Sequence, residues 1–168
     1  MIFVTVGTHE QQFNRLIKYI DFLKRDNYIN EEIIIQTGFS TYIPQYCIWN
    51  KMFQYKDILK KIEDARIVIT HGGPSSFIMP LQAGKIPIVV PRQKQFNEHV
   101  NNHQLDFSKI VAERQGNIIV VENINDLKDI ILNYENIIKN MSNGINSNNS
   151  VFNNKFKIIV DELFIEKK

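Results

Sequence analysis

Cysteine is nearly absent from this chain of 168 residues, which contains only Cys47. A single thiol excludes a disulfide within the chain, so the fold has to be held together by its hydrophobic core. The neighbours of Cys47 are apolar, namely Tyr46, Ile48 and Trp49. We therefore expect a buried, reduced thiol in a cytosolic protein.

Long hydrophobic runs are missing as well. No stretch approaches the roughly 18 apolar residues of a membrane-spanning helix. The first ten residues, MIFVTVGTHE, lack the basic segment that opens a signal peptide, and they predict a first β-strand instead. We expect a protein that is soluble by itself and cytoplasmic, so that any link to a membrane must come through a partner or a surface contact.

Charge of one sign is also scarce, because 20 basic residues stand against 18 acidic ones and the net charge is +2. Such a small imbalance does not favour a nucleic-acid-binding surface, and no cluster of basic and aromatic residues suggests one. A nucleic-acid module is therefore the least favoured interpretation. The length of 168 residues suits a single domain with one core.

Apolar runs rich in β-branched residues alternate with stretches of helical period along most of the chain. This alternation predicts an α/β fold, a Rossmann-like parallel sheet with helices on both faces. The clearest helix spans residues 10–25, with an apolar stripe on one side and Lys18, Asp21 and Lys24 on another. Strands are expected near residues 2–6, 32–36, 45–49, 66–70, 86–90 and 118–121.

The composition changes near the end of the chain. Residues 141–150, MSNGINSNNS, are almost wholly Asn, Ser and Gly, which predicts a linker because such a segment buries too little apolar area to offset its ordering entropy. The α/β domain is accordingly expected over residues 1–140. Apolar residues recur at helical spacing beyond the linker, so residues 151–168 predict an amphipathic helix that packs on this sheet or on another protein.

Three loops are expected at the carboxyl ends of the strands, where parallel α/β sheets bind ligands. Gly7, Thr8 and His9 follow the first strand, His71 to Ser76 follow the fourth, and Arg92 to Gln104 follow the fifth. All four histidines of the chain fall in these loops. Their clustering indicates a functional site.

The middle loop has the composition of an anion-binding site. Gly72 and Gly73 allow close approach of the backbone, Pro74 suits the first turn of a helix, and the free N–H groups of that turn carry partial positive charge. The hydroxyls of Ser75 and Ser76 can add donors. The pattern predicts a diphosphate site, and a tight strand-to-helix turn with a capping serine remains an equal alternative.

The third loop favours the diphosphate interpretation, because Arg92 and Lys94 bring positive charge beside the middle loop. Its polar residues offer donors and acceptors that suit sugar hydroxyls. Helical spacing would place four of them on one face, pointing into one small volume, whereas the alternative is a solvated helix face. The predicted sugar-binding residues are Glu98, His99, Asn102, His103 and Gln104.

Several familiar motifs are absent from the sequence. There is no GxGxxG after the first strand and no GxxxxGK[ST], so neither a dinucleotide fingerprint nor a P-loop is supported. An acyl hydrolase is disfavoured, because HGG is present without a GxSxG elbow. His99 and His103 lie four residues apart, but HExxH is absent and no third ligand is evident, so we expect no metal site.

Taken together, HGGP and GKIPIVVPRQKQFNEHVNNHQ resemble the donor-binding C-terminal domain of the glycosyltransferase 28 family. The opening IFVTVGTHEQQFNRLI is similar to the start of the soluble catalytic subunit of the split enzymes in this family, in the PssE-like or EpsF-like form of bacterial polysaccharide synthesis. The resemblance covers roughly residues 1–120. It implies one lobe of a two-lobed GT-B glycosyltransferase.

The resemblance implies an inverting hexosyltransferase that acts as a complex in capsule or exopolysaccharide biosynthesis. The donor would be a nucleotide-diphosphate sugar, usually UDP-linked, and the acceptor a lipid-linked saccharide. The partner would be a membrane-associated, acceptor-binding glycosyltransferase subunit, and no cofactor or essential bound metal is implied. The alternative is a non-catalytic subunit that binds a nucleotide sugar.

The resemblance also carries roles to individual residues. It places Gly72, Gly73, Ser75 and Ser76 at the diphosphate, Glu98, His99 and Asn102 near the donor sugar, and Phe53 near the uracil base. One position departs from the pattern, because Met79 stands where many members carry a glutamate that holds the ribose hydroxyls. Within this chain His9 is the candidate general base, since histidine titrates near neutrality, and the base could equally lie on the partner.

Overall fold

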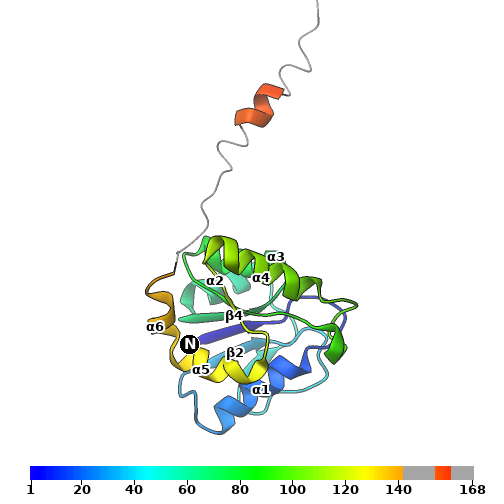
Figure 1. Ribbon diagram of the computed structural model, residues 1–168. Coiled ribbons are helices and arrows are strands. Elements are labelled where there is room, and N and C mark those ends of the chain that lie inside the picture. Colours follow the sequence, from blue (N-terminus) through cyan, green and yellow to red (C-terminus); the bar gives the residue numbers. More distant parts are fainter. Residues whose placement is uncertain (142–153, 160–168) are drawn as a thin grey trace, which may run out of the picture.

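The computed structural model describes residues 1–141 and 154–159. Strands and helices alternate along the first of these ranges (Figure 1). The strands are β1 (Ile2–Thr5), β2 (Ile33–Gln36), β3 (Ile48–Asn50), β4 (Ile67–His71), β5 (Ile88–Val90) and β6 (Ile119–Val120). The helices are α1 (Asn14–Arg25), α2 (Tyr55–Asp64), α3 (Pro74–Gln82), α4 (His103–Gln115), α5 (Leu127–Leu132) and α6 (Tyr134–Ile138), with short 3-10 helices η1 (Lys94–Phe96) and η2 (Ile124–Asp126).

The strands form one parallel sheet in the order β3-β2-β1-β4-β5-β6. Every strand expected from an apolar run is present, and the predicted α/β class is confirmed. The chain first adds strands on one side of β1 and then, from β4 onward, on the other. At the carboxyl ends of β1 and β4, the loops that follow these two strands therefore run in opposite directions. They leave a crevice between them.

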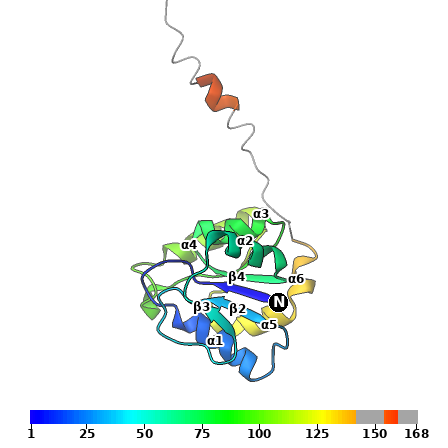
Figure 2. The ribbon, with the colours of Figure 1, turned by 180° about the vertical axis from the view of Figure 1, so that it is seen from behind.

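Helices cover both faces of the sheet, with α1 and α5 on one face and α2, α3 and α4 on the other (Figures 1 and 2). Alternate residues of β1 point to opposite faces, as the pleat of a strand requires. Val4 belongs to a buried cluster with Leu16 and Ile20 of α1. Phe3, next to it in sequence, packs on the opposite side against Ile62 of α2. Burial on both faces explains why the inner strands β1, β4 and β5 are apolar runs without alternation.

Helix α1 begins at Asn14 and not at residue 10, because the preceding residues are held by other parts of the chain. The carbonyls of Gln11 and Gln12 accept hydrogen bonds from Nη1 of Arg92 at 2.9 and 3.0 Å. The N–H of Phe13 donates to Oγ of Ser40 at 2.9 Å. These contacts hold the loop after β1 in a non-helical path and delay the first helical turn.

Asp21 is buried, although the helical pattern groups it with the lysines of α1. Its carboxylate accepts hydrogen bonds from the hydroxyl of Tyr42 at 2.7 Å and from the N–H groups of Gln45, Tyr46 and Cys47 at 2.9 to 3.1 Å. Burial alone would raise the pKa of Asp21, but these hydrogen bonds outweigh it and lower the pKa below its usual value. Asp21 thus anchors the connection from β2 to β3 on the α1 face.

Cys47 is only partly buried, which corrects the expectation of a buried thiol. Tyr46, Ile48 and Trp49 are exposed, because β3 is the outermost strand and they lie at or beside it. Burial still raises the pKa of the Cys47 thiol to about 12, with the charge of Asp21 adding to the effect. The thiol is therefore protonated and unreactive at neutral pH.

Near the end of the chain, residues 154–159 are helical and their side chains are exposed. The rest of the predicted linker (141–150) and terminal helix (151–168) lies outside the described residues, apart from Met141, so this division of the chain stays a prediction. None of the helices in the described ranges is both long and apolar enough to cross a membrane.

Replacing Asp21 with Asn tests the anchor between α1 and the segment after β2. We expect the free energy of unfolding to fall by roughly 2–4 kcal/mol at neutral pH. The side-chain amide of Asn has only one acceptor oxygen, and its NH2 group would face backbone N–H groups that also need an acceptor. The lowered pKa means that the native protein loses this stability as pH falls through the pKa of Asp21, so the two proteins should converge in acid. Denaturant unfolding at several pH values measures both effects.

Asp26→Asn is the matched control, since Asp26 ends the same helix but is exposed and pairs with Arg25 on the surface. Its stability should stay close to that of the native protein. A loss in Asp21→Asn no larger than in this control would contradict the anchoring role.

Candidate functional site

A cavity of about 330 Å³ opens at the crevice between the carboxyl ends of β1 and β4. Six of its lining residues are ones that the sequence predicts for the diphosphate or as the base: Gly7, Thr8, His9, His71, Ser75 and Ser76. They come from two loops that are more than 60 residues apart in sequence. The parallel topology brings these loops together, as the positions of the loops predict. The remaining lining residues are Thr5, Gln36, Ile58 and Met79.

The imidazole of His71 fills the space between the two glycine loops. A Cβ atom on Gly7 would lie 2.3 Å from Nε2 of His71, and one on Gly73 would lie 2.2 Å from Cε1. Gly7 also has a φ of 73°, in the region that favours glycine. Both positions therefore require glycine because a larger residue would collide with His71, whether or not a ligand also approaches the backbone there.

His71 is almost fully buried and makes short contacts through both ring nitrogens. Nδ1 accepts the N–H of Gly73 at 2.9 Å, and Nε2 lies 2.8 Å from Oγ of Ser76. Burial, together with the positive charge of Arg92, lowers the pKa of His71 to about 4. The ring is therefore neutral at physiological pH.

The first turn of α3 faces the cavity through Ser75 and Ser76. Pro74 occupies the first helical position, as predicted, and Gly73 precedes it as N-cap. The N-cap is a glycine without a side chain, and the N–H of Gly73 is accepted by His71, so neither serine acts as the capping residue of the alternative interpretation. Ser75 is exposed, whereas Ser76 is buried against His71. Gly72 lies deeper, where a Cβ would come within 2.9 Å of Gln104 Cβ on α4.

Arg92 does not reach into the cavity, which corrects its predicted contact with the diphosphate. Its side chain is fully buried and is held by backbone carbonyls of the loops around it. Nη2 donates to the carbonyl of Val6 at 2.9 Å, and Nη1 donates to those of Gln11, Gln12 and Glu98. These bonds occupy the terminal nitrogens, so Arg92 influences the cavity through its charge alone.

Glu98 is also turned inward, so its predicted contact with the sugar is wrong for this structure. The side chain has no exposed area, and its carboxylate accepts Nε and Nη2 of Arg15, both at 2.9 Å. The N–H of Gln93 donates to the same carboxylate at 3.1 Å. A carboxylate with these partners holds the loop after β5 against α1.

The predicted helical face over residues 98–103 does not form, because α4 begins only at His103. Asn side chains hydrogen-bond the local backbone and favour turns over helix in this segment. Oδ1 of Asn102 accepts the N–H of Lys94 at 2.9 Å, and Oδ1 of Asn101 accepts the N–H of His103 at 3.1 Å. Asn97 adopts a left-handed φ of 54°, which ends η1.

The remaining residues predicted around the sugar are spread over this loop. His99 lies beside His9, a lining residue of the cavity, with ring centroids 5.1 Å apart. Lys94, Asn102 and His103 are exposed. Gln104 is buried behind His71, where Oε1 accepts the N–H of Arg92 at 3.2 Å and lies 3.4 Å from Nδ1 of His71. Gln104 therefore supports His71 and does not line the cavity.

His9 is exposed at the mouth of the cavity. Partial burial lowers the pKa of His9 below 6.5, and the charges of Arg92 and His99 lower it further. A neutral imidazole can accept a proton, so His9 is in the protonation state that a general base needs at pH 7.

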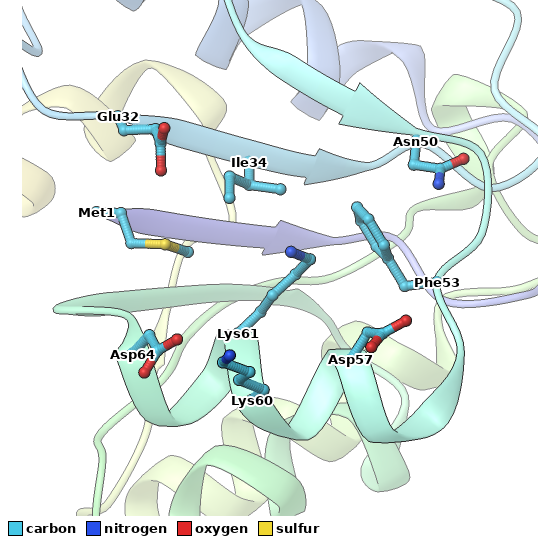
Figure 3. Close-up of a pocket in the computed structure, with 9 residues that line it drawn as sticks. All are labelled: Met1, Glu32, Ile34, Asn50, Phe53, Asp57, Lys60, Lys61 and Asp64. Carbon is cyan, nitrogen blue, oxygen red and sulfur yellow. The ribbon is translucent and has the colours of Figure 1, made fainter.

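Phe53 lies in a neighbouring groove and not in the cavity itself. Figure 3 shows this groove, of about 590 Å³, running between the sheet and α2, with Phe53 and Asn50 at one end and Met1 and Glu32 at the other. The N–H of Phe53 donates to Oε1 of Gln36 at 3.1 Å, and Nε2 of Gln36 donates to Oγ1 of Thr5 at 3.2 Å. Gln36 thus joins the end of the groove to the wall of the cavity.

Gln36 and Ile58 are cavity residues that the sequence interpretation missed. The signal for Gln36 is its place as the last residue of β2, since polar residues at the carboxyl ends of neighbouring parallel strands converge. Ile58 follows the helical pattern of α2 and carries no such signal. Met79 lines the cavity, where the resemblance leads one to expect a carboxylate.

No metal ligand set is evident in the described residues, in which no three His, Cys, Asp or Glu side chains come together. Across these residues the polar atoms of the cavity are hydroxyls, imidazoles, an amide and backbone groups. Such a lining suits an anion with attached hydroxyl-bearing groups. The absence of a cofactor or metal stays a prediction.

Comparison with known proteins gives consistent results. The chain is 34% identical over 117 residues to the human (Homo sapiens) UDP-N-acetylglucosamine transferase subunit ALG13, and 30% identical over 118 residues to its mouse (Mus musculus) counterpart. Each match covers 64% of this chain, but the chain spans only about a tenth of the length of these relatives, 10% and 9%.

The fold is similar to that of the glycosyltransferase SnogD from Streptomyces nogalater, with a TM-score of 0.50 and 15% identity over 83% of this chain and 39% of that one. This likeness shows the fold, one half of a two-lobed GT-B architecture. Residues 1–163 match the glycosyltransferase family 28 C-terminal domain. The chain therefore belongs to the glycosyltransferase family 28 C-terminal domain family.

Proposed function

We propose that this chain is the donor-binding subunit of a glycosyltransferase and holds a nucleotide-diphosphate sugar, UDP-linked, in the cavity between β1 and β4. The observation that carries the proposal is the meeting of Gly7 with the uncapped first turn of α3 at one cavity. Backbone N–H groups at such a turn favour an anion. The names of the human and mouse relatives, which are UDP-N-acetylglucosamine transferase subunits, support a UDP-linked donor.

In the proposed reaction, an acceptor hydroxyl attacks the anomeric carbon of the donor sugar while the bond from that carbon to the diphosphate oxygen breaks. The diphosphate leaves with additional negative charge. The first turn of α3 and the hydroxyls of Ser75 and Ser76 would stabilise that charge, and Arg92 would contribute through its field from behind the loop. Because attack and departure take place on opposite faces of the carbon, the reaction inverts its configuration.

The proton of the acceptor hydroxyl has to pass to a base. His9 is the side chain at the cavity mouth that is placed for this role, and its lowered pKa keeps the imidazole neutral and able to accept the proton; the partner subunit is the alternative source. We propose a membrane-associated, acceptor-binding subunit as this partner, a lipid-linked saccharide as acceptor, and a role in capsule or exopolysaccharide biosynthesis. The chain would then work at the inner face of the membrane through its partner.

A second candidate function is a subunit that binds the nucleotide sugar without catalysing transfer. Met79 favours it, since this thioether lines the cavity where the family pattern has an acidic residue and cannot accept hydrogen bonds as a carboxylate does. Calorimetry identifies binding, and transfer of radiolabelled sugar by the chain with its partner and membranes separates the two functions. Binding without any transfer would favour the second.

The diphosphate site can be tested by titrating the protein with UDP, UMP and UDP-sugars in a calorimeter. UDP should bind more tightly than UMP, because the second phosphate contributes the contacts with the α3 turn. Ser75→Ala should lower the affinity for UDP by about tenfold, which corresponds to the loss of one hydrogen bond to a charged group. The affinity for UMP should fall less.

Lys109→Ala serves as the control for this titration, because Lys109 pairs with Glu122 on the surface and lies outside the cavity lining. It should leave UDP binding unchanged. Equal affinity for UDP and UMP in the native protein would count against a diphosphate site.

The role of His9 can be tested in the reconstituted pair of subunits. His9→Ala should reduce kcat by about 100-fold or more with little change in the KM for donor, because general base catalysis typically contributes about 10²–10⁴-fold. Since the pKa of His9 lies below 6.5, the native rate should hold through neutral pH and fall only as pH drops through that lowered pKa, where the imidazole gains its proton. An unchanged turnover in His9→Ala would assign the base to the partner.

A further inference from the structure

His71 lies between a group that can only donate and a group that can both donate and accept. The N–H of Gly73 points at Nδ1 at 2.9 Å, and the hydroxyl of Ser76 lies 2.8 Å from Nε2. A neutral imidazole carries one proton, on one nitrogen or the other. The two neighbours therefore decide the tautomer.

The backbone N–H settles the position of that proton. Nδ1 must offer its lone pair to Gly73, so the proton of the neutral ring resides on Nε2. Oε1 of Gln104 lies farther from Nδ1, at 3.4 Å, and already accepts the N–H of Arg92 at 3.2 Å, so it does not require a proton on Nδ1. The ring is neutral because burial and Arg92 lower the pKa of His71 to about 4.

The tautomer fixes the role of Ser76. With a proton on Nε2, His71 donates and Oγ of Ser76 accepts, so the hydroxyl proton of Ser76 is directed elsewhere. Within the described residues this hydroxyl has no other hydrogen-bond partner, and Ser76 lines the cavity. The same tautomer prevents His71 from taking a proton from Ser76, so the pair cannot work as a nucleophile and its base despite the short distance.

We propose that His71 is a positioning residue that holds Ser76 with its hydroxyl proton toward the cavity, which makes Ser76 a fixed donor to the diphosphate of the nucleotide sugar. The proposal rests on the proposed function for its ligand. His71, Gly73 and Ser76 hold this arrangement through contacts among themselves, so the protein itself orients the donor. Such preorganisation favours the charge that develops on a departing diphosphate.

The tautomer can be measured directly on the full chain by nitrogen-15 NMR of its histidine side chains at neutral pH. His71 should show a protonated Nε2 and an unprotonated Nδ1, with no titration across the neutral range. The His71→Gln variant identifies its signals. A proton on Nδ1, or a doubly protonated ring, overturns the proposal whether or not a nucleotide binds.

The action of His71 through Ser76 can be tested by a double-mutant cycle read out as UDP affinity. Ser76→Ala and His71→Leu should each lower the affinity for UDP by about tenfold. The double variant should be no weaker than either single one, because both changes remove the same donor. His71→Gln should retain most of the affinity, since its amide N–H can replace Nε2–H.

Ser75→Ala provides the matched comparison, because Ser75 lines the same cavity without contacting His71 in the described hydrogen bonds. Its effect should multiply with that of His71→Leu. A multiplicative effect between His71→Leu and Ser76→Ala would mean that His71 is only structural, and would overturn the proposal. Absence of UDP binding by the native chain contradicts the proposed function and the role of Ser76 toward a diphosphate, whereas the NMR result stands on its own.

Discussion

The buried guanidinium of Arg92 is the interaction on which the rest of the site depends. It ties the loop after β1 to the loop after β5 through carbonyls of Val6, Gln11, Gln12 and Glu98, and it lies 4.8 Å from the centre of the Phe13 ring. Burial lowers the pKa of Arg92 to about 10, an effect that Glu98 opposes, so the side chain keeps its charge at neutral pH. Removal of such a partner would leave several carbonyls buried without donors, which is costly.

The charge of Arg92 also adds to the effect of burial on the histidines in front of it. Together with burial it lowers the pKa values of both His71 and His9, so two imidazoles stay neutral beside one cation. Their exposures separate their roles. The buried ring of His71 packs between glycines and directs a serine, whereas the exposed ring of His9 at the cavity mouth is available to a proton from outside. An anion at the α3 turn would therefore meet neutral hydrogen-bond donors and the more distant positive charge of Arg92. The two imidazoles would carry no charge beside it at neutral pH.

Two neighbouring hollows give the site its extent. The smaller cavity gathers the loop groups suited to a diphosphate, and the larger groove of Figure 3 carries Phe53 beside α2. Gln36 joins them, because its amide is bound to Phe53 on one side and to Thr5 on the other. Ile58 and Met79 complete the lining of the cavity beside Gln36.

The sequence by itself determined the parallel α/β sheet, because its inner strands are apolar runs that must be buried on both faces. It also determined that the loops with Gly7 and His71 share one edge, since parallel strands carry their carboxyl ends to the same side. Only the tertiary structure decided that Asp21, Arg92 and Glu98 point inward. Their partners are distant in sequence, as with Glu98 and Arg15, which are 83 residues apart, and local periodicity counts a charged residue as exposed. Whether a charge is buried depends on the groups that solvate it in place of water, and the folded chain alone brings those groups together.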